Sequence, residues 1–321
     1  MPTLSNREIS QRAAALRELL SPCELCPRRC GIDRLSGATG FCGLSDRSVV
    51  ASVLPHHGEE PPISGTSGSG TIFFSSCNAA CLFCQNYQIS QLRQGQIKTI
   101  EALARDFVHL QSRGCHNLNW VTPTPQLPMI VKALALASEQ GCRLPVVYNT
   151  NGYDRREVLQ LLDGIVDIYL PDIKYGSDVW AEQFSQLPDY YAVARAAVTE
   201  MHRQVGVLQT DKSGIATQGL LVRHLIIPEG TAGSVKVFRL LAGIDPEIPV
   251  SVMAQYRPCY RAVGHPVLGR SINRREYNQA VEELELSGLH NVFLQHFDNL
   301  SDEDLFFPDF NDTQVFRGNR E

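Results

Sequence analysis

The sequence predicts an α/β fold built on a parallel sheet. From residue 71 onward, short β-branched or apolar runs alternate with longer stretches of helical spacing, and this alternation is typical of repeated βα units. Six such units share residues 71–297, so each strand with its crossover has about 38 residues, an ordinary size. Seven of the ten cysteines fall in two tight clusters, which adds metal chemistry to this fold.

The first 70 residues differ from the rest. Residues 1–22 have an amphipathic helical pattern that ends at Ser21-Pro22, and residues 23–43 form a loop rich in Cys, Gly and Arg. We expect a strand over 48–54. The Gly-, Ser- and Pro-rich stretch after it predicts no regular element. Its charged or titratable residues are expected in a solvated loop, with an approach to the metal site or to a substrate as the alternative: His56, His57, Glu59 and Glu60. A domain boundary near residue 70 separates this Cys-rich extension from the rest.

The predicted strands and helices then follow in alternation. The strands span 71–75, 117–121, 144–150, 166–173, 219–228 and 248–256, with a seventh edge strand at 291–295. The helices span 99–113, 126–140, 154–163, 178–205 with a break at Pro188, 232–243 and 273–287. Residues 298–321 form an acidic tail, in which Phe306, Phe307 and Phe310 indicate docking onto the protein.

Composition excludes several classes of protein. Hydrophobic residues make up 43% and charged residues 20% of the 321 positions, as in soluble globular chains. The net charge of -5 and the lack of a long Lys/Arg run argue against a nucleic-acid partner. No apolar run approaches 18 residues and no signal peptide is recognisable, so we expect a cytoplasmic protein without a membrane partner.

Cys77, Cys81 and Cys84 have the spacing C-x3-C-x2-C directly after the strand at 71–75, where strand ends gather ligands. Three thiolates bind three irons of a 4Fe-4S cluster and leave the fourth iron open. The amino and carboxylate groups of S-adenosylmethionine (SAM) fit an open iron, and electron transfer from the cluster then releases a 5′-deoxyadenosyl radical. A zinc site or buried thiols are the alternative for these residues.

The run SSCNAACLFCQNYQIS, with Phe83 directly before its last cysteine, resembles the signature loop of the radical SAM superfamily. From Cys23 to about Tyr256 the chain is similar to the branch related to pyruvate formate-lyase activating enzyme, in particular to relatives with a Cys-rich N-terminus. The resemblance implies a partial (β/α)6 barrel with a small Cys-rich N-terminal extension. It also implies a bound 4Fe-4S cluster and SAM, with Phe83 beside the cofactor.

The resemblance further assigns two strand-end turns to SAM. The turn TPTP at 122–125 stands where the family has a Gly-Gly-Glu turn whose backbone receives the methionine amino group, so Thr122 and Thr124 are expected near SAM without the Glu side chain. Asn149, Thr150 and Asn151 match an Asp-Thr-Asn-Gly turn, and Asn in its first place weakens any monovalent cation site beside the SAM carboxylate.

Charged residues and one amide complete the implied SAM site. Asp172 and Lys174 match the family's Asp-Leu-Lys strand end, with a simple ion pair at the barrel mouth as the alternative. Arg223 aligns with an arginine that contacts the SAM carboxylate, and its apolar strand requires an anionic partner, either that carboxylate or Asp172. Gln255 stands near where relatives often carry a histidine. His224 is expected to point the opposite way along its strand.

Cys23, Cys26, Cys30 and Cys42 form a second set with the spacing C-x2-C-x3-C-x11-C. Four thiolates supply all the protein ligands that a metal site needs, so zinc, a rubredoxin-like iron or a second iron-sulfur cluster fits here. Zinc or a single iron is slightly favoured, because the sequence shows no partner site that would feed an auxiliary cluster. The three single cysteines are expected to be inert: Cys115, Cys142 and Cys259.

The sequence therefore predicts a radical enzyme that reductively cleaves SAM and abstracts hydrogen from a substrate. The resemblance implies a flavodoxin- or ferredoxin-type electron donor and a protein substrate, a backbone glycine of a partner glycyl-radical enzyme. Modification of a small molecule or peptide is an alternative within this class. An iron-sulfur or zinc protein that carries electrons or binds a partner is the non-catalytic alternative, which three rather than four cysteines at 77–84 disfavour.

Overall fold

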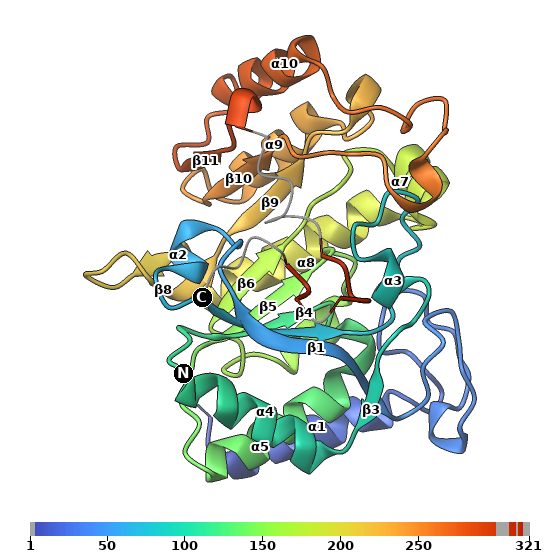
Figure 1. Cartoon of the computed structure of the whole chain (residues 1–321), viewed down its shortest axis with the longest axis vertical. Helices are drawn as coiled ribbons and strands as arrows, with labels where there is room; N and C mark the ends of the chain where they lie inside the picture. The colour runs from blue at the N-terminus through green and yellow to red at the C-terminus, as the bar shows by residue number, and fades with distance from the viewer. Residues whose placement is uncertain (1–3, 300–307, 313, 317–321) are drawn as a thin grey trace.

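The structure, a computed structural model, describes residues 4–299, 308–312 and 314–316. It confirms the α/β class: a curved and mostly parallel sheet carries helices along its outer side (Figure 1). The eight-stranded sheet has the order β3-β1-β2-β4-β5-β6-β8-β7, and a three-stranded sheet has the order β11-β10-β9. The strands are β1 Ser48–His56, β2 Ser69–Phe74, β3 Gln96–Lys98, β4 Leu118–Val121, β5 Val146–Thr150, β6 Ile168–Pro171, β7 Gln209–Thr210, β8 Ala216–Leu220, β9 Val222–Leu225, β10 Val250–Met253 and β11 Val292–Leu294.

A parallel bridge between Asp172 and Arg223 joins the two sheets. Strands β2, β4, β5, β6 and β8 pair in parallel on one side of it, and β9, β10 and β11 pair in parallel on the other. All six expected parallel strands and the seventh edge strand are present, and the arrangement is consistent with a partial barrel. Parallel strands place their C-terminal ends along one edge, so this edge gathers the strand-end residues.

The expected strand at 219–228 is divided into β8 and β9, which corrects the prediction of one continuous strand. Gly219 has a φ of +122°, and a Cβ atom there would lie 2.3 Å from the Cα of Leu208. The strand β8 ends one residue later, at Leu220, and β9 begins at Val222; β8 also pairs with β7 in a short hairpin.

The strand expected at 48–54 is β1, and it joins the same sheet as the barrel strands. It pairs antiparallel with β2, and His56 lies opposite Ser69 at the start of β2. The division into domains at residue 70 stays a prediction. Within the stretch expected to hold no regular element, the short helix α2 (Pro61–Ser64) begins with prolines in its first turn, where a missing N–H costs no hydrogen bond.

The expected helices are all present. They are α1 Asn6–Glu18, α4 Ile100–Ser112, α5 Leu127–Glu139, α6 Arg156–Gln160, α7 Asp178–Ser185, α8 Tyr190–Val205, α9 Ser234–Ile244 and α10 Arg274–Glu285, with the short α3 Tyr87–Ser90 and the 3-10 turns η1 Arg34–Ser36, η2 Thr124–Gln126, η3 Pro228–Gly230, η4 Tyr260–Ala262 and η5 Phe297–Asn299. The break between α7 and α8 contains Pro188, as expected. Capping boxes begin α1 at Ser5 and α10 at Asn273.

The helices bury their apolar faces against the sheet and against each other. Helix α1 packs on α5 through Ile9, Ala13 and Leu16, and α5 packs on α4. Figure 1 shows these three helices together below the sheet, with α9 and α10 at the opposite end. This rigid frame fixes the strand ends, and therefore the side chains that follow them.

Candidate active site

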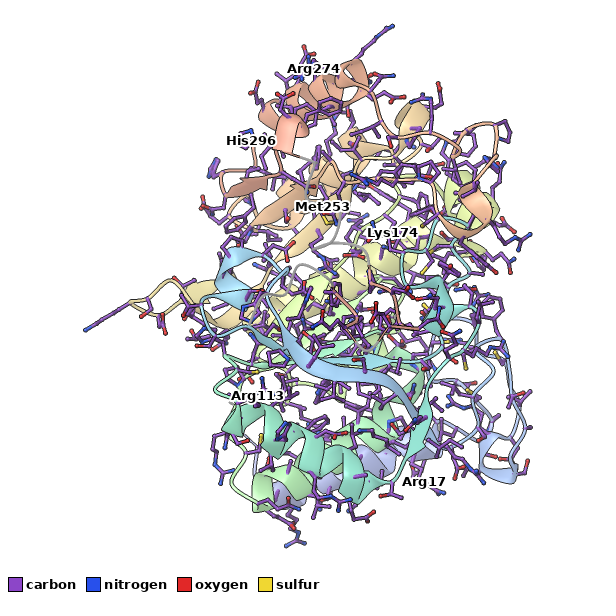
Figure 2. All side chains as sticks on the ribbon, in the orientation of Figure 1. Arg17, Arg113, Lys174, Met253, Arg274 and His296 are labelled. Atoms are coloured by element: carbon purple, nitrogen blue, oxygen red, sulfur yellow. The ribbon has the colours of Figure 1, made fainter. Side chains whose placement is uncertain are left out.

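One pocket is lined by nearly all of the residues that the sequence assigned to SAM or to the 4Fe-4S cluster of Cys77, Cys81 and Cys84. It runs along the strand ends of the barrel, and Figure 2 shows Lys174 and Met253, two of its lining residues, near the middle of the molecule. The assigned residues that line it are Cys77, Cys81, Phe83, Cys84, Thr122, Asn149, Thr150, Asn151, Asp172, Lys174, Arg223 and Gln255.

Thr124 is the exception. Its side chain is buried, and its Oγ1 lies 2.7 Å from Oδ1 of Asp154 and 3.0 Å from the hydroxyl of Tyr148. It does not line the pocket, because the 3-10 turn η2 points it into this internal network. Its neighbour Thr122 does face the pocket and has a φ of +58°, a left-handed conformation that costs a β-branched residue roughly 1–2 kcal/mol.

The cysteine loop begins after β2, every residue of which is buried. The Sγ of Cys81 accepts a hydrogen bond from Ser185 at 3.0 Å, and Cys77 accepts from the backbone of Ala79 at 3.3 Å and from Asn151 at 3.4 Å. Burial raises the pKa of the Cys77 thiol to about 12 and that of Cys84 to about 11. These thiols are therefore protonated until a metal displaces the protons.

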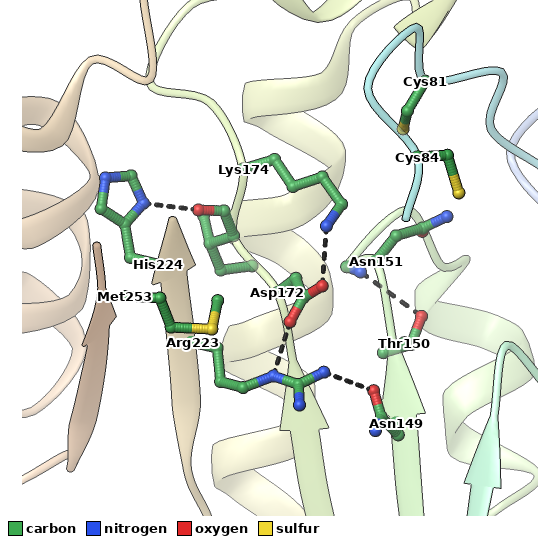
Figure 3. A network of polar contacts seen from close by, with 12 residues as sticks. Cys81, Cys84, Asn149, Thr150, Asn151, Asp172, Lys174, Arg223, His224 and Met253 are labelled. Atoms are coloured by element: carbon green, nitrogen blue, oxygen red, sulfur yellow. Dashed lines mark hydrogen bonds and ion pairs between the residues drawn. The ribbon is translucent and has the colours of Figure 1, made fainter. Parts of the chain in front are cut away.

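Asp172, Lys174 and Arg223 form a network of charges below the cysteine loop (Figure 3). The Lys174 ammonium lies 2.7 Å from Oδ2 of Asp172, and Nε of Arg223 lies 2.7 Å from Oδ1 of the same carboxylate. The remaining nitrogens of Arg223 donate to Glu59 at 2.8 Å and to Asn149 at 2.6 Å. Arg223 thus meets Asp172, one of its two expected partners, and also Glu59.

The network keeps its members charged despite burial. Burial alone would raise the pKa of Asp172, but Arg223 and then Lys174 outweigh it and leave the pKa below its ordinary value. Burial would likewise lower the pKa of Lys174, and Asp172 reverses the direction. The pocket therefore offers fixed positive and negative charges, which suits a zwitterionic ligand.

The alternation of side chains along β9 places Arg223 toward the pocket and His224 away from it, as expected. His224 lies 2.7 Å from the carbonyl of Ile173 and 2.9 Å from the hydroxyl of Ser234. Burial lowers its pKa to about 4, so it is a neutral, structural histidine.

His56 was expected in a solvated loop together with Glu59 and Glu60, but it is buried, and the prediction is wrong for the two glutamates as well. Their side chains are only 7% and 9% exposed. Glu59 accepts from Arg223, Asn119 and Asn149. Because β1 runs antiparallel to β2, the segment after β1 reaches the pocket from the end opposite the cysteine loop. The only signal in the sequence was the placement of two adjacent acids just before Pro61.

The described C-terminal residues 308–312 and 314–316 also line the pocket, through Pro308 and Phe316. Phe316 stacks on His56 with ring centroids 4.1 Å apart, and Phe310 meets Phe73 edge-on at 5.2 Å. This confirms docking for Phe310, whereas Phe306 and Phe307 lie outside the described residues. The Gln88 side chain donates to Asp309 and accepts from the backbone N–H of Phe310, both at 2.8 Å.

The four N-terminal cysteines line a second cavity together with Arg28, Arg34 and Asn78. The three single cysteines lie elsewhere: Cys115 and Cys142 are buried, and Cys259 donates to the carbonyl of Phe83 at 3.2 Å. Among the described residues, no three His, Cys, Asp or Glu side chains are already arranged around one point as metal ligands are. The thiols instead contact hydroxyl and N–H groups, which also favour cluster sulfur and thiolates.

Residues 71–202 match the family model of the radical SAM superfamily. The chain belongs to this superfamily. Radical SAM proteins use a 4Fe-4S cluster and SAM, and the donor set fits this pair, since three thiols face the same pocket as the charges that suit a zwitterion. In the described part of the chain, no helix is long and apolar enough to cross a membrane.

Two curated relatives of this radical SAM chain come from Methanocaldococcus jannaschii. The uncharacterized protein MJ0674 is 30% identical over 289 residues, which cover 86% of this chain and 78% of that protein. The uncharacterized protein MJ0808 is 28% identical over 176 residues, which cover 49% of this chain and 50% of that protein.

Two solved structures are similar to the radical SAM chain at 10% identity. Streptococcus suis SuiB, bound to the precursor peptide SuiA, has a TM-score of 0.45 over 69% of this chain and 47% of SuiB. HydG, a maturase of the FeFe-hydrogenase, has a TM-score of 0.49 over 94% of this chain and 67% of HydG.

Proposed function

We propose that this radical SAM enzyme reductively cleaves SAM and abstracts hydrogen from a substrate at the pocket between the cysteine loop and Glu59. The observation that carries the proposal is the meeting of Cys77, Cys81 and Cys84 with the Asp172–Lys174–Arg223 network in one pocket. When bound there, a 4Fe-4S cluster supplies the electron that breaks the S–C5′ bond of SAM, which yields methionine and the 5′-deoxyadenosyl radical that takes hydrogen from the substrate.

The protein's own residues bind and orient SAM in this proposal. Lys174 and Arg223 provide cationic donors for its carboxylate, and Asp172 keeps both donors charged and fixed. The backbone at Thr122 and the side chains of Asn149, Thr150, Asn151 and Gln255 provide polar contacts along the pocket. Phe83 and Phe73 form apolar parts of its wall, which limit access of water to a reactive intermediate.

The test is anaerobic reconstitution with iron and sulfide, followed by dithionite and SAM. Cys77→Ala, Cys81→Ala and Cys84→Ala should each abolish formation of 5′-deoxyadenosine, whereas Cys115→Ala, a buried thiol outside the pocket, should leave it intact. A Cys77→Ala protein that cleaves SAM at the parental rate contradicts the proposal. A parental protein that binds iron but never cleaves SAM would favour the non-catalytic iron-sulfur alternative.

For the substrate, we propose a backbone glycine of a partner glycyl-radical enzyme, on the strength of the resemblance to the pyruvate formate-lyase activating branch. A small molecule or short peptide is the second candidate, and it is favoured by Pro308 and Phe316 of the C-terminal tail, which line part of the pocket. Incubation with candidate partners that carry deuterium-labelled glycine separates the two, because only glycine activation transfers label into 5′-deoxyadenosine.

We also propose that Cys23, Cys26, Cys30 and Cys42 hold a separate metal, zinc or iron. They line a common cavity in a segment whose only regular element is η1, and four thiolates close a metal site. A Cys77/Cys81/Cys84 triple-Ala protein, purified without oxygen, should still contain metal. A folded, metal-free triple variant would disprove this site. The proposed electron donor is a flavodoxin- or ferredoxin-type protein, and the proposed location is the cytoplasm.

A further inference from the structure

The second cysteine cavity and the cysteine loop of the pocket share a wall. Asn78, which follows Cys77 directly, lines the cavity formed by Cys23, Cys26, Cys30 and Cys42. Arg28 connects the two sides, because its Nε donates to the carbonyl of Asn78 at 2.5 Å and it also donates to the carbonyl of Gln186. The residue that follows Cys77 therefore forms part of the wall of the second cavity.

The cavity contains two guanidinium groups whose contacts are neutral. Arg28 lies over the ring of Phe41 at 3.3 Å, and Arg34, only 1% exposed, donates to the carbonyls of Ser45 and Pro125 at 2.6 and 2.9 Å. Within residues 4–299 and the described part of the tail, neither meets a carboxylate at ion-pair distance. A nearby anion stabilises a guanidinium that is removed from water, and a metal centre with four thiolates is an anion.

The two cysteine sites differ in their access to the outside. Cys30 is exposed, whereas Cys81 is buried and both its loop neighbours are only partly accessible. The other three N-terminal cysteines are buried or half-buried like those of the loop, so the exposed Cys30 gives a centre there the side that a protein electron donor can approach. A zinc ion there would brace the segment but could not carry an electron, because zinc has no redox chemistry.

We infer that Cys23, Cys26, Cys30 and Cys42 hold a second iron-sulfur cluster that is the electron entry site of this enzyme. Held by these four thiolates, such a cluster would take one electron from a reduced flavodoxin- or ferredoxin-type donor and would give it, past Asn78 and Arg28, to the cluster held by Cys77, Cys81 and Cys84. No bond forms or breaks and no proton moves in this step. The inference deepens the proposed function and rests on it.

The first measurement is the iron, sulfide and zinc content of the full-length protein after anaerobic reconstitution. The parent should contain about eight iron atoms per chain, and a Cys26→Ala/Cys30→Ala variant about four, with a corresponding loss of one reduced-cluster signal in electron paramagnetic resonance. Cys142→Ala, a buried single thiol, is the matched control and should match the parent. About four irons and one zinc in the parent would overturn the inference and leave the proposed function standing.

The second measurement compares two reductants of SAM cleavage. Dithionite is small enough to reach the pocket directly, so the double variant should still form 5′-deoxyadenosine with it, while formation driven by reduced flavodoxin should fall by roughly tenfold or more. Equal flavodoxin-driven rates in variant and parent would overturn the inference. Loss of cleavage with dithionite in the parent itself would instead contradict the proposed function.

Arg28→Gln covers the case in which the double variant fails to fold. It keeps all seven clustered thiols, so the iron content should stay parental, and it should slow only the flavodoxin-driven reaction. An unchanged ratio of flavodoxin-driven to dithionite-driven rates would count against the relay.

Discussion

Replacing Arg223 by lysine tests the charge network most directly. The guanidinium makes three contacts of 2.6–2.8 Å, with Asp172, Glu59 and Asn149, and its side chain is 14% exposed. Lysine keeps the charge but is a single point donor, so it cannot serve all three partners. Each buried hydrogen bond to a charged group contributes about 1.5–3 kcal/mol, so we expect Arg223→Lys to lower the free energy of unfolding by about 2–4 kcal/mol.

The assay is thermal and urea unfolding of the protein without SAM. For a chain of 321 residues, a loss of this size lowers the Tm by roughly 3–6 °C. Arg270→Lys is the matched control, because Arg270 pairs with Glu229 and Glu276 but its side chain is 41% exposed, and exposed pairs contribute about 1 kcal/mol or less. Equal Tm values for Arg223→Lys and Arg270→Lys would refute the reasoning.

Calorimetric titration of SAM into the reconstituted Arg223→Lys protein then separates the two roles of this arginine. Weaker binding of SAM supports contact with the carboxylate of the cofactor. Parental affinity together with lower stability would restrict Arg223 to its structural pairing with Asp172 and Glu59.

Three further predictions concern pH, the sheet and the tail. Burial lowers the pKa of His56 and of His224 to about 4. Between pH 6.5 and pH 4 only the unfolded chain therefore gains these protons, so the free energy of unfolding falls by up to about 1.4 kcal/mol per pH unit and histidine as the pH is lowered. Urea unfolding of His56→Phe should show a shallower fall with pH, and an identical fall would contradict this prediction. Gly219→Ala should lower the free energy of unfolding by more than about 2 kcal/mol, because the new Cβ would lie 2.3 Å from the Cα of Leu208. Gly243→Ala in α9 is the control: a Cβ there meets open space, so this variant should be neutral or slightly more stable in the same unfolding assay. Gln88→Ala removes the side-chain hydrogen bonds to Asp309 and to the backbone of Phe310. Hydrogen exchange at the Phe310 amide should therefore be faster than in Gln279→Ala, a control on the exposed surface. Unchanged exchange would show that the aromatic contacts alone hold this part of the tail.

Local patterns were enough to predict the barrel and most of the pocket. Each βα unit is recognisable within about 40 residues, and parallel strands necessarily gather their C-terminal ends, so the sequence alone predicts that Cys77, Asn149, Asp172 and Arg223 lie together. The division between β8 and β9 was missed because the surroundings of this segment, such as the close approach of Leu208 to Gly219, depend on the tertiary arrangement and no local pattern reveals them.

The wrong expectation for Glu59 and Glu60 has a similar origin. A polar loop is usually solvated, and only the antiparallel pairing of β1 with β2 carries these acids inside, where Arg223 compensates Glu59. Thr124 was misplaced for the opposite reason: the turn that holds it is at the correct strand end, but its side chain satisfies the buried Asp154. Strand ends could be predicted from sequence, whereas side-chain direction within a turn required the three-dimensional arrangement.

The docking of Phe310 and Phe316 has a consequence for the order in which parts of the protein are made. Synthesis proceeds from the N-terminus, so all the strands of the barrel and both cysteine sets leave the ribosome before Phe316. Until then, His56 and Phe73 lack the aromatic partners that later cover them. During this interval the nascent pocket has one wall fewer, and a cofactor delivered then meets a wider entrance than the finished protein offers.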